Sequence, residues 1–350
     1  AAEGGVPRPV GGDPRALVYS SDGQRGWVAG LGSNNVLPID ASGARRGEPI
    51  SVGQGPVALV LDEPRGRLYV WNHFEVSLSQ VASPRGVEPA RVPVFKPLPA
   101  AIREGRPLLY DTHRTSGLGQ ASCASCHVDA RMDRLAWDLG DPSAPLQRFD
   151  QNCVTTRGLP ACTDYHAMKG PMTTQTLQDI IGHEPLHWRG DRAGIEAFNP
   201  AFVGLLGDDT ELSASEMLAF KRHLATISFP PNPFRNFDNT LPSQIALPGH
   251  YTSGRFAMQG LPLGSGNPQR GLTLYTQGLL DSPFQCASCH TLPTGMAVNG
   301  PLFLGVLGVS VGGSIMPLGP MGENHLGIVS TDGSTNVSIK VPHLRNQYEK

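Results

Sequence analysis

The chain has 350 residues, of which 39% are hydrophobic, and its formal net charge at pH 7 is −2. This length suffices for two or three domains, and so small a net charge argues against nucleic acid as a partner. No apolar run reaches the roughly 18 residues of a membrane span, and no charged-then-apolar leader opens the sequence, so we expect no membrane span.

The first hundred residues contain a repeat with an offset of 42 residues. Residues 14–18 (PRALV) return as residues 56–60 (PVALV), and residues 27–29 (WVA) return as residues 69–71 (YVW). Each copy predicts short strands separated by turns, and this period is typical of four-stranded propeller blades. Residues 1–95 are therefore predicted to form a partial β-propeller of two blades. Because two blades cannot close a ring, we expect further blades or another subunit at their free strand edges.

Three helices are predicted beyond a proline-rich linker. Residues 105–110 (GRPLLY) and 270–275 (RGLTLY) each begin a helix shortly before a cysteine motif. A capping box at Ser213 and Glu216 predicts a third, which prolines at 230–233 end. We therefore expect a first haem domain over residues 96–235 and a second over 236–350, the latter truncated at its C-terminus.

The pentapeptide Cys-Ala-Ser-Cys-His occurs twice, at residues 123–127 and 286–290. Two thiols three positions apart lie one helical turn from each other, so both can add to the vinyl groups of one porphyrin while the next imidazole binds the iron. A zinc site or a disulfide would not require histidine directly after the second cysteine. The predicted attachment residues are Cys123, Cys126, Cys286 and Cys289, and the predicted proximal ligands are His127 and His290. Two covalently bound haem c groups are therefore expected.

The remaining cysteines and the haem chemistry indicate a compartment. Haem attachment to this motif takes place outside the cytoplasm, so we expect a periplasmic, cell-surface or extracellular protein. Cys153 and Cys162 are left as a pair that can close a short loop, and an oxidising compartment would make them a disulfide.

Several segments in a fixed order resemble the bacterial di-haem cytochrome c peroxidase and MauG superfamily over about residues 100–350. They are 117–122 (GLGQAS), 174–177 (TQTL), 187–192 (HWRGDR) and 340–346 (KVPHLRN), interleaved with the two cysteine motifs. Residues 67–72 (RLYVWN) also resemble a YVTN-type propeller repeat. These resemblances imply a mixed fold, with two mainly α-helical cytochrome c domains preceded by two blades. They also imply that Trp188 is an electron bridge between the haems, and that calcium binds between the domains, although Thr173 stands where an asparagine is usual.

The superfamily also implies distal iron ligands. His166 stands where members can place a distal histidine for the first haem, with Met168 and Met172 as thioether alternatives. The usual second-haem ligand would follow residue 346, so we consider four substitutes within the chain: Met316, Met321, His325 and His343. His183 and His187 are expected to be surface groups or groups that support the ligands.

The chain departs from the peroxidases of this superfamily at the expected distal side. Phe198 occupies the position of a glutamine that helps to move the proton of peroxide, and Phe202 would make that face drier. Asp208 and Asp209 stand near the place of a second acid-base group but suit a helix start equally well. We therefore expect weak peroxide turnover.

Three functions are compatible with the sequence. The first is an electron carrier with a small cytochrome or cupredoxin as redox partner. The second is a peroxide-reducing or oxygen-activating enzyme, and the third is a structural or assembly subunit of a larger redox complex. An enzyme needs one weakly ligated iron, whereas a carrier needs two irons whose coordination changes little on reduction.

Overall fold

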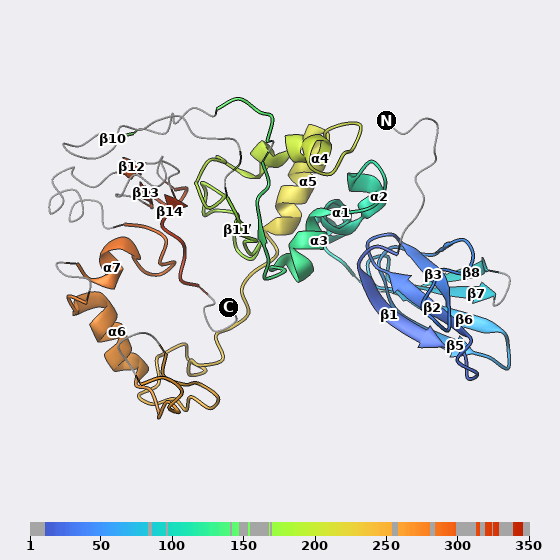
Figure 1. The fold of residues 1–350 in the computed structure, drawn as a ribbon, viewed down its shortest axis with the longest axis horizontal. Coiled ribbons are helices and arrows are strands. Elements are labelled where there is room, and N and C mark those ends of the chain that lie inside the picture. The colour runs from blue at the N-terminus through green and yellow to red at the C-terminus, as the bar shows by residue number, and fades with distance from the viewer. Residues whose placement is uncertain are drawn as a thin grey trace. The chain divides into compact units, whose positions relative to one another are not determined.

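The computed structural model describes residues 11–82, 86–95, 97–140, 142–146, 153–154, 168, 170–253, 258–280, 284–298, 313–315, 319–323, 325–328 and 339–345 (Figure 1). The chain forms two compact units. Unit 1 consists of Ala1–Asp138, Gly170–Leu186 and Arg192–Ser228, and unit 2 of Leu139–Lys169, His187–Asp191 and Phe229–Lys350. Each unit carries one cysteine motif.

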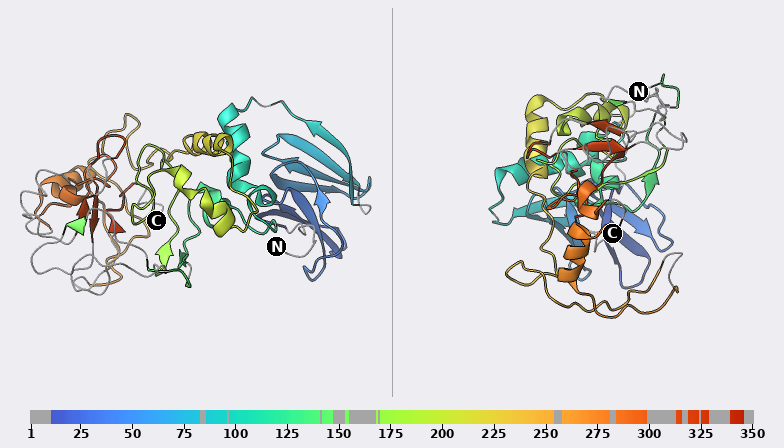
Figure 2. Two further views of the ribbon diagram at one scale, coloured as in Figure 1. Left: turned by 90° about the horizontal axis from the view of Figure 1, so that it is seen from above. Right: turned by 90° about the vertical axis from the view of Figure 1, so that its left-hand side faces the viewer.

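The N-terminal part of unit 1 contains two four-stranded antiparallel sheets, one from each copy of the repeat (Figure 2). The first sheet contains β1 (Pro14–Tyr19), β2 (Arg25–Gly30), β3 (Asn35–Asp40) and β4 (Ile50–Ser51). The second contains β5 (Pro56–Asp62), β6 (Arg67–Asn72), β7 (Ser77–Ala82) and β8 (Val87–Pro93). In both sheets the strands follow chain order, and β1 lies beside β5.

Alternation of side chains explains these strands. In β6 every second residue, namely Leu68, Val70 and Asn72, is buried, because successive side chains of a strand point to opposite faces. The Leu68 and Val70 side chains belong to a core that both sheets share, with Trp27 and Val36 from the first sheet. Both copies of the repeat also share a β-bulge in the first strand of the sheet, at Arg15 in one and at Val57 in the other.

The rest of unit 1 is a small helical body. It contains α1 (Ala100–Tyr110), α2 (Thr112–Thr115), α3 (Cys123–Cys126), α4 (Pro200–Gly204) and α5 (Ala214–Leu224), with 3-10 turns at η1 (Val128–Ala130) and η2 (Ile195–Phe198). A two-stranded ladder joins β9 (Ala136–Trp137) to β11 (Met172–Thr173). The predicted capping box of α5 is confirmed, because the Ser213 side chain accepts from the backbone of Glu216. The helix ends at Leu224, before the prolines.

The crossing of α1 and α5 organises this helical body. Gly105 permits it, because a Cβ on Gly105 would meet the carbonyl oxygen of Ala219 and the Cβ of His223. The buried core at this crossing includes Leu108 and Leu109 from α1 with Phe220 and Leu224 from α5.

Unit 2 has a different balance of elements. Its helices among the described residues are α6 (Pro268–Gln277) and α7 (Cys286–Cys289). A four-stranded antiparallel sheet has the order β10 (Cys153–Val154), β12 (Gly313–Ile315), β13 (Leu326–Ile328) and β14 (Ile339–Lys340). No residue of α6 is buried, and a Cβ on its Gly271 would meet no atom within 4 Å.

The predicted fold class of two mainly α-helical cytochrome c domains after two blades is wrong. Within the described residues only α1, α5 and α6 exceed five residues, and four-stranded antiparallel sheets account for much of the remaining regular structure. The physical reason is composition: glycine (42 residues) and proline (32 residues) interrupt helices by backbone entropy and by loss of the N–H donor. Among the residues described, no helix combines the length and apolar character needed to cross a membrane.

Candidate functional site

The first cysteine motif forms a single helical turn. In α3 the Ser122 and Ser125 side chains each accept from the other residue's backbone N–H, which defines where the turn begins. The turn ends at His127, whose N–H donates to the Cys123 carbonyl at 2.9 Å. Cys123 and Cys126 are both free thiols.

The second motif repeats this local structure. In α7 the Gln285 and Ser288 side chains cap the turn, and the N–H of His290 donates to the Cys286 carbonyl at 3.0 Å. Cys286 and Cys289 are both half-buried. Both CxxC segments are therefore single helical turns that end at a histidine.

Each of these histidines is oriented by a backbone carbonyl. Nδ1 of His127 lies 2.7 Å from the carbonyl oxygen of Gln175, and Nδ1 of His290 lies 2.7 Å from that of Gly295. A carbonyl oxygen only accepts, so Nδ1 is the donor in each neutral ring and Nε2 carries the lone pair. This is the tautomer and the outer hydrogen bond that a metal-ligating histidine normally has.

The two orienting carbonyls come from different kinds of structure. Gln175 lies on the segment that follows β11. This segment is held by two hydrogen bonds: the N–H of Thr174 donates to the Leu135 carbonyl (3.1 Å), and the N–H of Leu177 donates to the Ala130 carbonyl (2.9 Å). Gly295 instead belongs to a local turn, closed by the bridge between Thr291 and Ala297. The first histidine therefore depends on long-range structure, and the second does not.

Burial affects the thiols of the first motif. Burial raises the pKa of the Cys123 thiol to about 11 and also raises the pKa of Cys126. The fold therefore disfavours the thiolate form of both side chains.

The unit 1 residues expected near the first iron have other surroundings. Phe202 is 2% exposed and packs edge-to-face on Phe220, with ring centroids 6.2 Å apart. Phe198 packs against the same core, and the Arg192 guanidinium lies 6.0 Å from its ring centroid. Asp208 accepts from the N–H of Asp209 at 2.8 Å. These contacts fit packing and turn roles, so the distal assignment stays a prediction.

The remaining unit 1 residues named from the sequence are distributed over two segments. Met172 and Thr173 form β11, where Met172 is half-buried and Thr173 is exposed. His183 lies 3.7 Å from Asp179 through Nε2 and a carboxylate oxygen. The calcium and thioether roles stay predictions.

Unit 2 holds the predicted bridge, Trp188. The carbonyl of Trp188 accepts from the N–H of Lys340 at 2.7 Å, which joins this segment to the one that carries the 340–346 resemblance. Beside it, Nδ1 of His187 lies 2.9 Å from Asp191, in line with a supporting role. The bridge itself stays a prediction.

The candidate ligands of the second iron also lie in unit 2. His325 is 2% exposed, and its Nε2 would stand 2.8 Å from a Cβ on Gly319. Met321 is 73% exposed. Nδ1 of His343 accepts from the N–H of Arg345 at 3.2 Å, and its ring lies 5.9 Å from that of Phe229. Of these three, His325 alone is a buried imidazole.

Other predicted residues lie outside the description. His166, Met316 and Cys162 are outside the described residues, as is the side chain of Cys153. Met168 is described and half-buried. Across the part of the chain that is described, no cluster of three or more His, Cys, Asp or Glu is placed to hold a metal ion.

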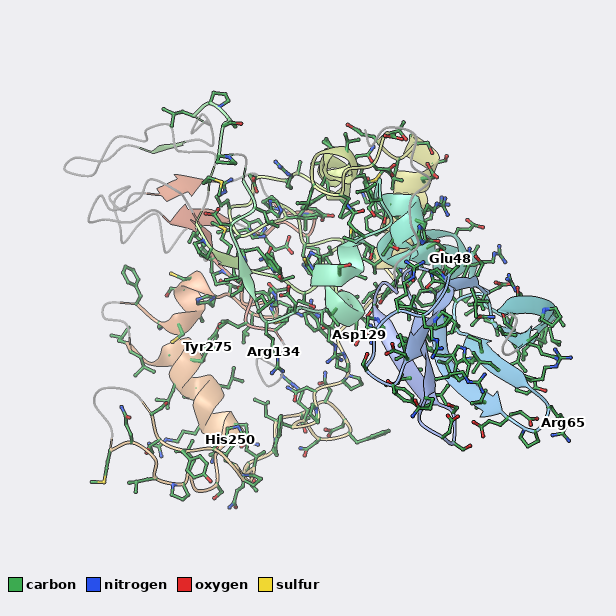
Figure 3. The ribbon with its side chains drawn as sticks, turned by 45° about the vertical axis from the view of Figure 1, so that its right-hand side comes forward. Glu48, Arg65, Asp129, Arg134, His250 and Tyr275 are labelled. Carbon is green, nitrogen blue, oxygen red and sulfur yellow. The ribbon has the colours of Figure 1, made fainter. Side chains whose placement is uncertain are left out.

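Sequence reasoning missed the residues that support the two motifs. The carbonyls of Gln175 and Gly295 carry no side-chain signal, although Gln175 lies within the segment 174–177 that carried the resemblance. The contact between the first sheet and the motif loop was also missed: Arg15 of β1 binds Asp129, two residues after His127, with a nitrogen–oxygen distance of 2.8 Å. Figure 3 labels Asp129, which lies between α3 and the first sheet.

Comparison with solved structures finds several similar chains, two of which are described here. The chain is similar to hydrazine synthase of Kuenenia stuttgartiensis (24% identity, TM-score 0.24, over 27% of each chain) and to the same protein pressurised with xenon (15% identity, TM-score 0.32, over 57% of each chain). The chain thus spans about a quarter of the first of these structures and somewhat over half of the second. No protein-family model and no curated protein matches it. At such TM-scores the likeness carries no statement about function.

Proposed function

We propose that this chain is an exported di-haem c-type cytochrome that carries electrons between two covalently bound haems. The observation that carries this proposal is the repeated geometry at the two motifs. In each, a CxxC turn ends at a histidine whose Nδ1 is 2.7 Å from a backbone carbonyl. Two such sites, built from unrelated supporting segments, are difficult to explain unless each imidazole is prepared to bind a metal through Nε2.

The residues present fit a haem group. Cys123 and Cys126, and likewise Cys286 and Cys289, would supply thiols one turn apart for thioether bonds, and His127 and His290 would each supply a ring nitrogen to the iron. When bound, each haem supplies a one-electron iron couple. The protein's part is to fix the imidazole tautomer and to hold its orientation.

The choice of electron carrier over peroxidase is supported by the surroundings of Phe198. The resembled peroxidases have a glutamine where this chain has Phe198, and a phenyl ring cannot move a proton. A positioned acid-base group contributes about 10²- to 10⁴-fold to such reactions, so we expect peroxide turnover to be weak by a factor of that order.

Electronic spectra and denatured-protein mass together test the proposal. We expect two haems per chain that resist acid-acetone extraction and titrate reversibly as one-electron couples. Extractable haem, or fewer than two per chain, would overturn the di-haem cytochrome. Two attached haems with rapid peroxide turnover would instead favour the enzyme alternative.

Partners and location follow as parts of the same proposal. The attachment chemistry supports an oxidising, non-cytoplasmic location, where the Cys153–Cys162 disulfide would also form. A small cytochrome or cupredoxin is the proposed redox partner. The two sheets of residues 14–93 support a role for further blades or another subunit.

A further inference from the structure

The first sheet reaches the loop that follows the proximal histidine of unit 1. Arg15 lies at the β-bulge of β1, between Pro14 and Ala16, where the register of the strand pair shifts. A bulge re-aims the side chain of its extra residue. Here the guanidinium meets the Asp129 carboxylate at two points, with nitrogen–oxygen distances of 2.8 and 3.4 Å.

Arg15 is a departure from the repeat. The second sheet has the same bulge 42 residues later, between Pro56 and Ala58, but Val57 occupies it. The backbone irregularity therefore belongs to the blade pattern, whereas the charge belongs to the first blade alone. Asp13 accepts from the same guanidinium at 3.1 Å and helps to fix its direction.

The loop that Arg15 holds has an unfavourable backbone. Asp129 has φ 54° and ψ 35°, and Ala130 has φ 59°, so two successive non-glycine residues lie in the left-handed region. Such conformations persist only where the surroundings impose them. The structure offers contacts on two sides: Arg15 on the Asp129 side chain, and the N–H of Leu177 on the Ala130 carbonyl at 2.9 Å.

This loop is directly connected to His127. The N–H of Ala130 donates to the His127 carbonyl at 2.9 Å, and the segment that holds Ala130 also supplies the Gln175 carbonyl for Nδ1. A change of backbone at Asp129 therefore reaches the imidazole through one hydrogen-bonded turn.

We propose that Arg15 of the first blade is a positioning residue for His127: it holds Asp129 in the left-handed turn and so sets the orientation of the imidazole toward the first haem. The proposal rests on the proposed function, because it needs a haem at His127. It gives the blades a role in tuning that haem, beyond any role as a docking module.

The test uses the full holoprotein and the residue that the second repeat has at this bulge. Arg15→Val should change the electron paramagnetic resonance signal of the oxidised first haem and lower its reduction potential, because the Asp129 charge is left without its partner. The second haem should keep its signal and potential. Arg15→Lys should restore much of both, and Arg65→Gln, which breaks the exposed pair with Asp62 in the second sheet, should change neither.

A glycine background separates positioning from charge and from misfolding. Glycine adopts φ near +54° without penalty, so Asp129→Gly should keep the native signal. In that background Arg15→Val should no longer alter the signal. An unchanged signal in Arg15→Val alone, with two haems per chain, would overturn the proposal. So would an equal change in both backgrounds. A native chain that carries no covalently attached haem would instead count against the proposed function.

Discussion

The Arg106 guanidinium lies 4.3 Å from the ring centroid of Phe74 and donates to the Phe74 carbonyl at 2.9 Å, which fastens α1 to the second sheet. Burial lowers the pKa of Arg106, so this charge is desolvated and depends on the ring and the carbonyl. The contact joins the blades to the helix that precedes the first motif.

Replacing Arg106 with methionine should destabilise unit 1. Methionine keeps the apolar contacts of the arginine stem but loses the cation–π contact and the hydrogen bond from the charged donor. We therefore expect the free energy of unfolding to fall by about 1–3 kcal/mol. Urea unfolding followed by circular dichroism measures it. Arg103→Met is the matched control, because Arg103 lies on the same helix and is 64% exposed. Equal effects of the two variants would show that the Phe74 contact contributes nothing.

Glycine-to-alanine changes before the two motifs should have opposite signs. Gly105→Ala places a methyl group against the Ala219 carbonyl and should cost about 1–3 kcal/mol by forcing α1 and α5 apart. Gly271→Ala in α6 meets no atom within 4 Å and should stabilise that helix by about 0.5–1 kcal/mol. Thermal unfolding of both variants checks the pair. A stabilising Gly105→Ala would show that the two helices do not cross closely.

Acid should destabilise the chain through His223. This imidazole is 5% exposed, neither of its ring nitrogens has a hydrogen-bond partner, and burial, with a smaller contribution from Arg106, lowers its pKa from 6.5 to about 4. Between pH 6.5 and pH 4, His223 therefore binds a proton more readily in the unfolded chain than in the folded chain. The associated stability is complete above pH 6.5 and is lost as the pH falls toward 4, by at most about 3 kcal/mol.

The pH dependence of unfolding in His223→Leu checks this assignment. The variant lacks the titrating group, so its unfolding free energy should fall less than that of the native chain between pH 7 and pH 4.5. Comparing the two chains cancels the contribution of carboxylates common to both. Identical profiles would mean that His223 takes up its proton as readily in the folded chain as in the unfolded one.

Removing one cysteine pair should remove one haem. Cys123→Ser with Cys126→Ser should leave one covalent haem per chain, and Cys286→Ser with Cys289→Ser should do the same, because each pair serves its own porphyrin. Haem absorbance per chain should fall by half in either variant, and mass spectrometry should show one group attached. Retention of two covalent groups by either variant would contradict the assignment.

The sequence by itself was sufficient where the signal is local. A five-residue motif is enough to predict a CxxC turn that ends at a histidine, and Ser213 with Glu216 is enough to predict the start of α5, because these structures depend on residues three or four positions apart. The 42-residue repeat likewise predicted strands whose burial alternates every second residue, as β6 shows.

Tertiary structure alone decided what supports these local elements. The carbonyl that orients His127 belongs to Gln175, 48 residues away. Because every residue has a backbone carbonyl, no pattern of side chains in the sequence predicts this contact. Arg15 and Asp129 are 114 residues apart and meet because a bulge in β1 turns the guanidinium toward the motif loop. The helical content was overestimated for a related reason: a resemblance carried by a few motifs says little about the glycine- and proline-rich segments between them, where backbone entropy and missing donors favour loops.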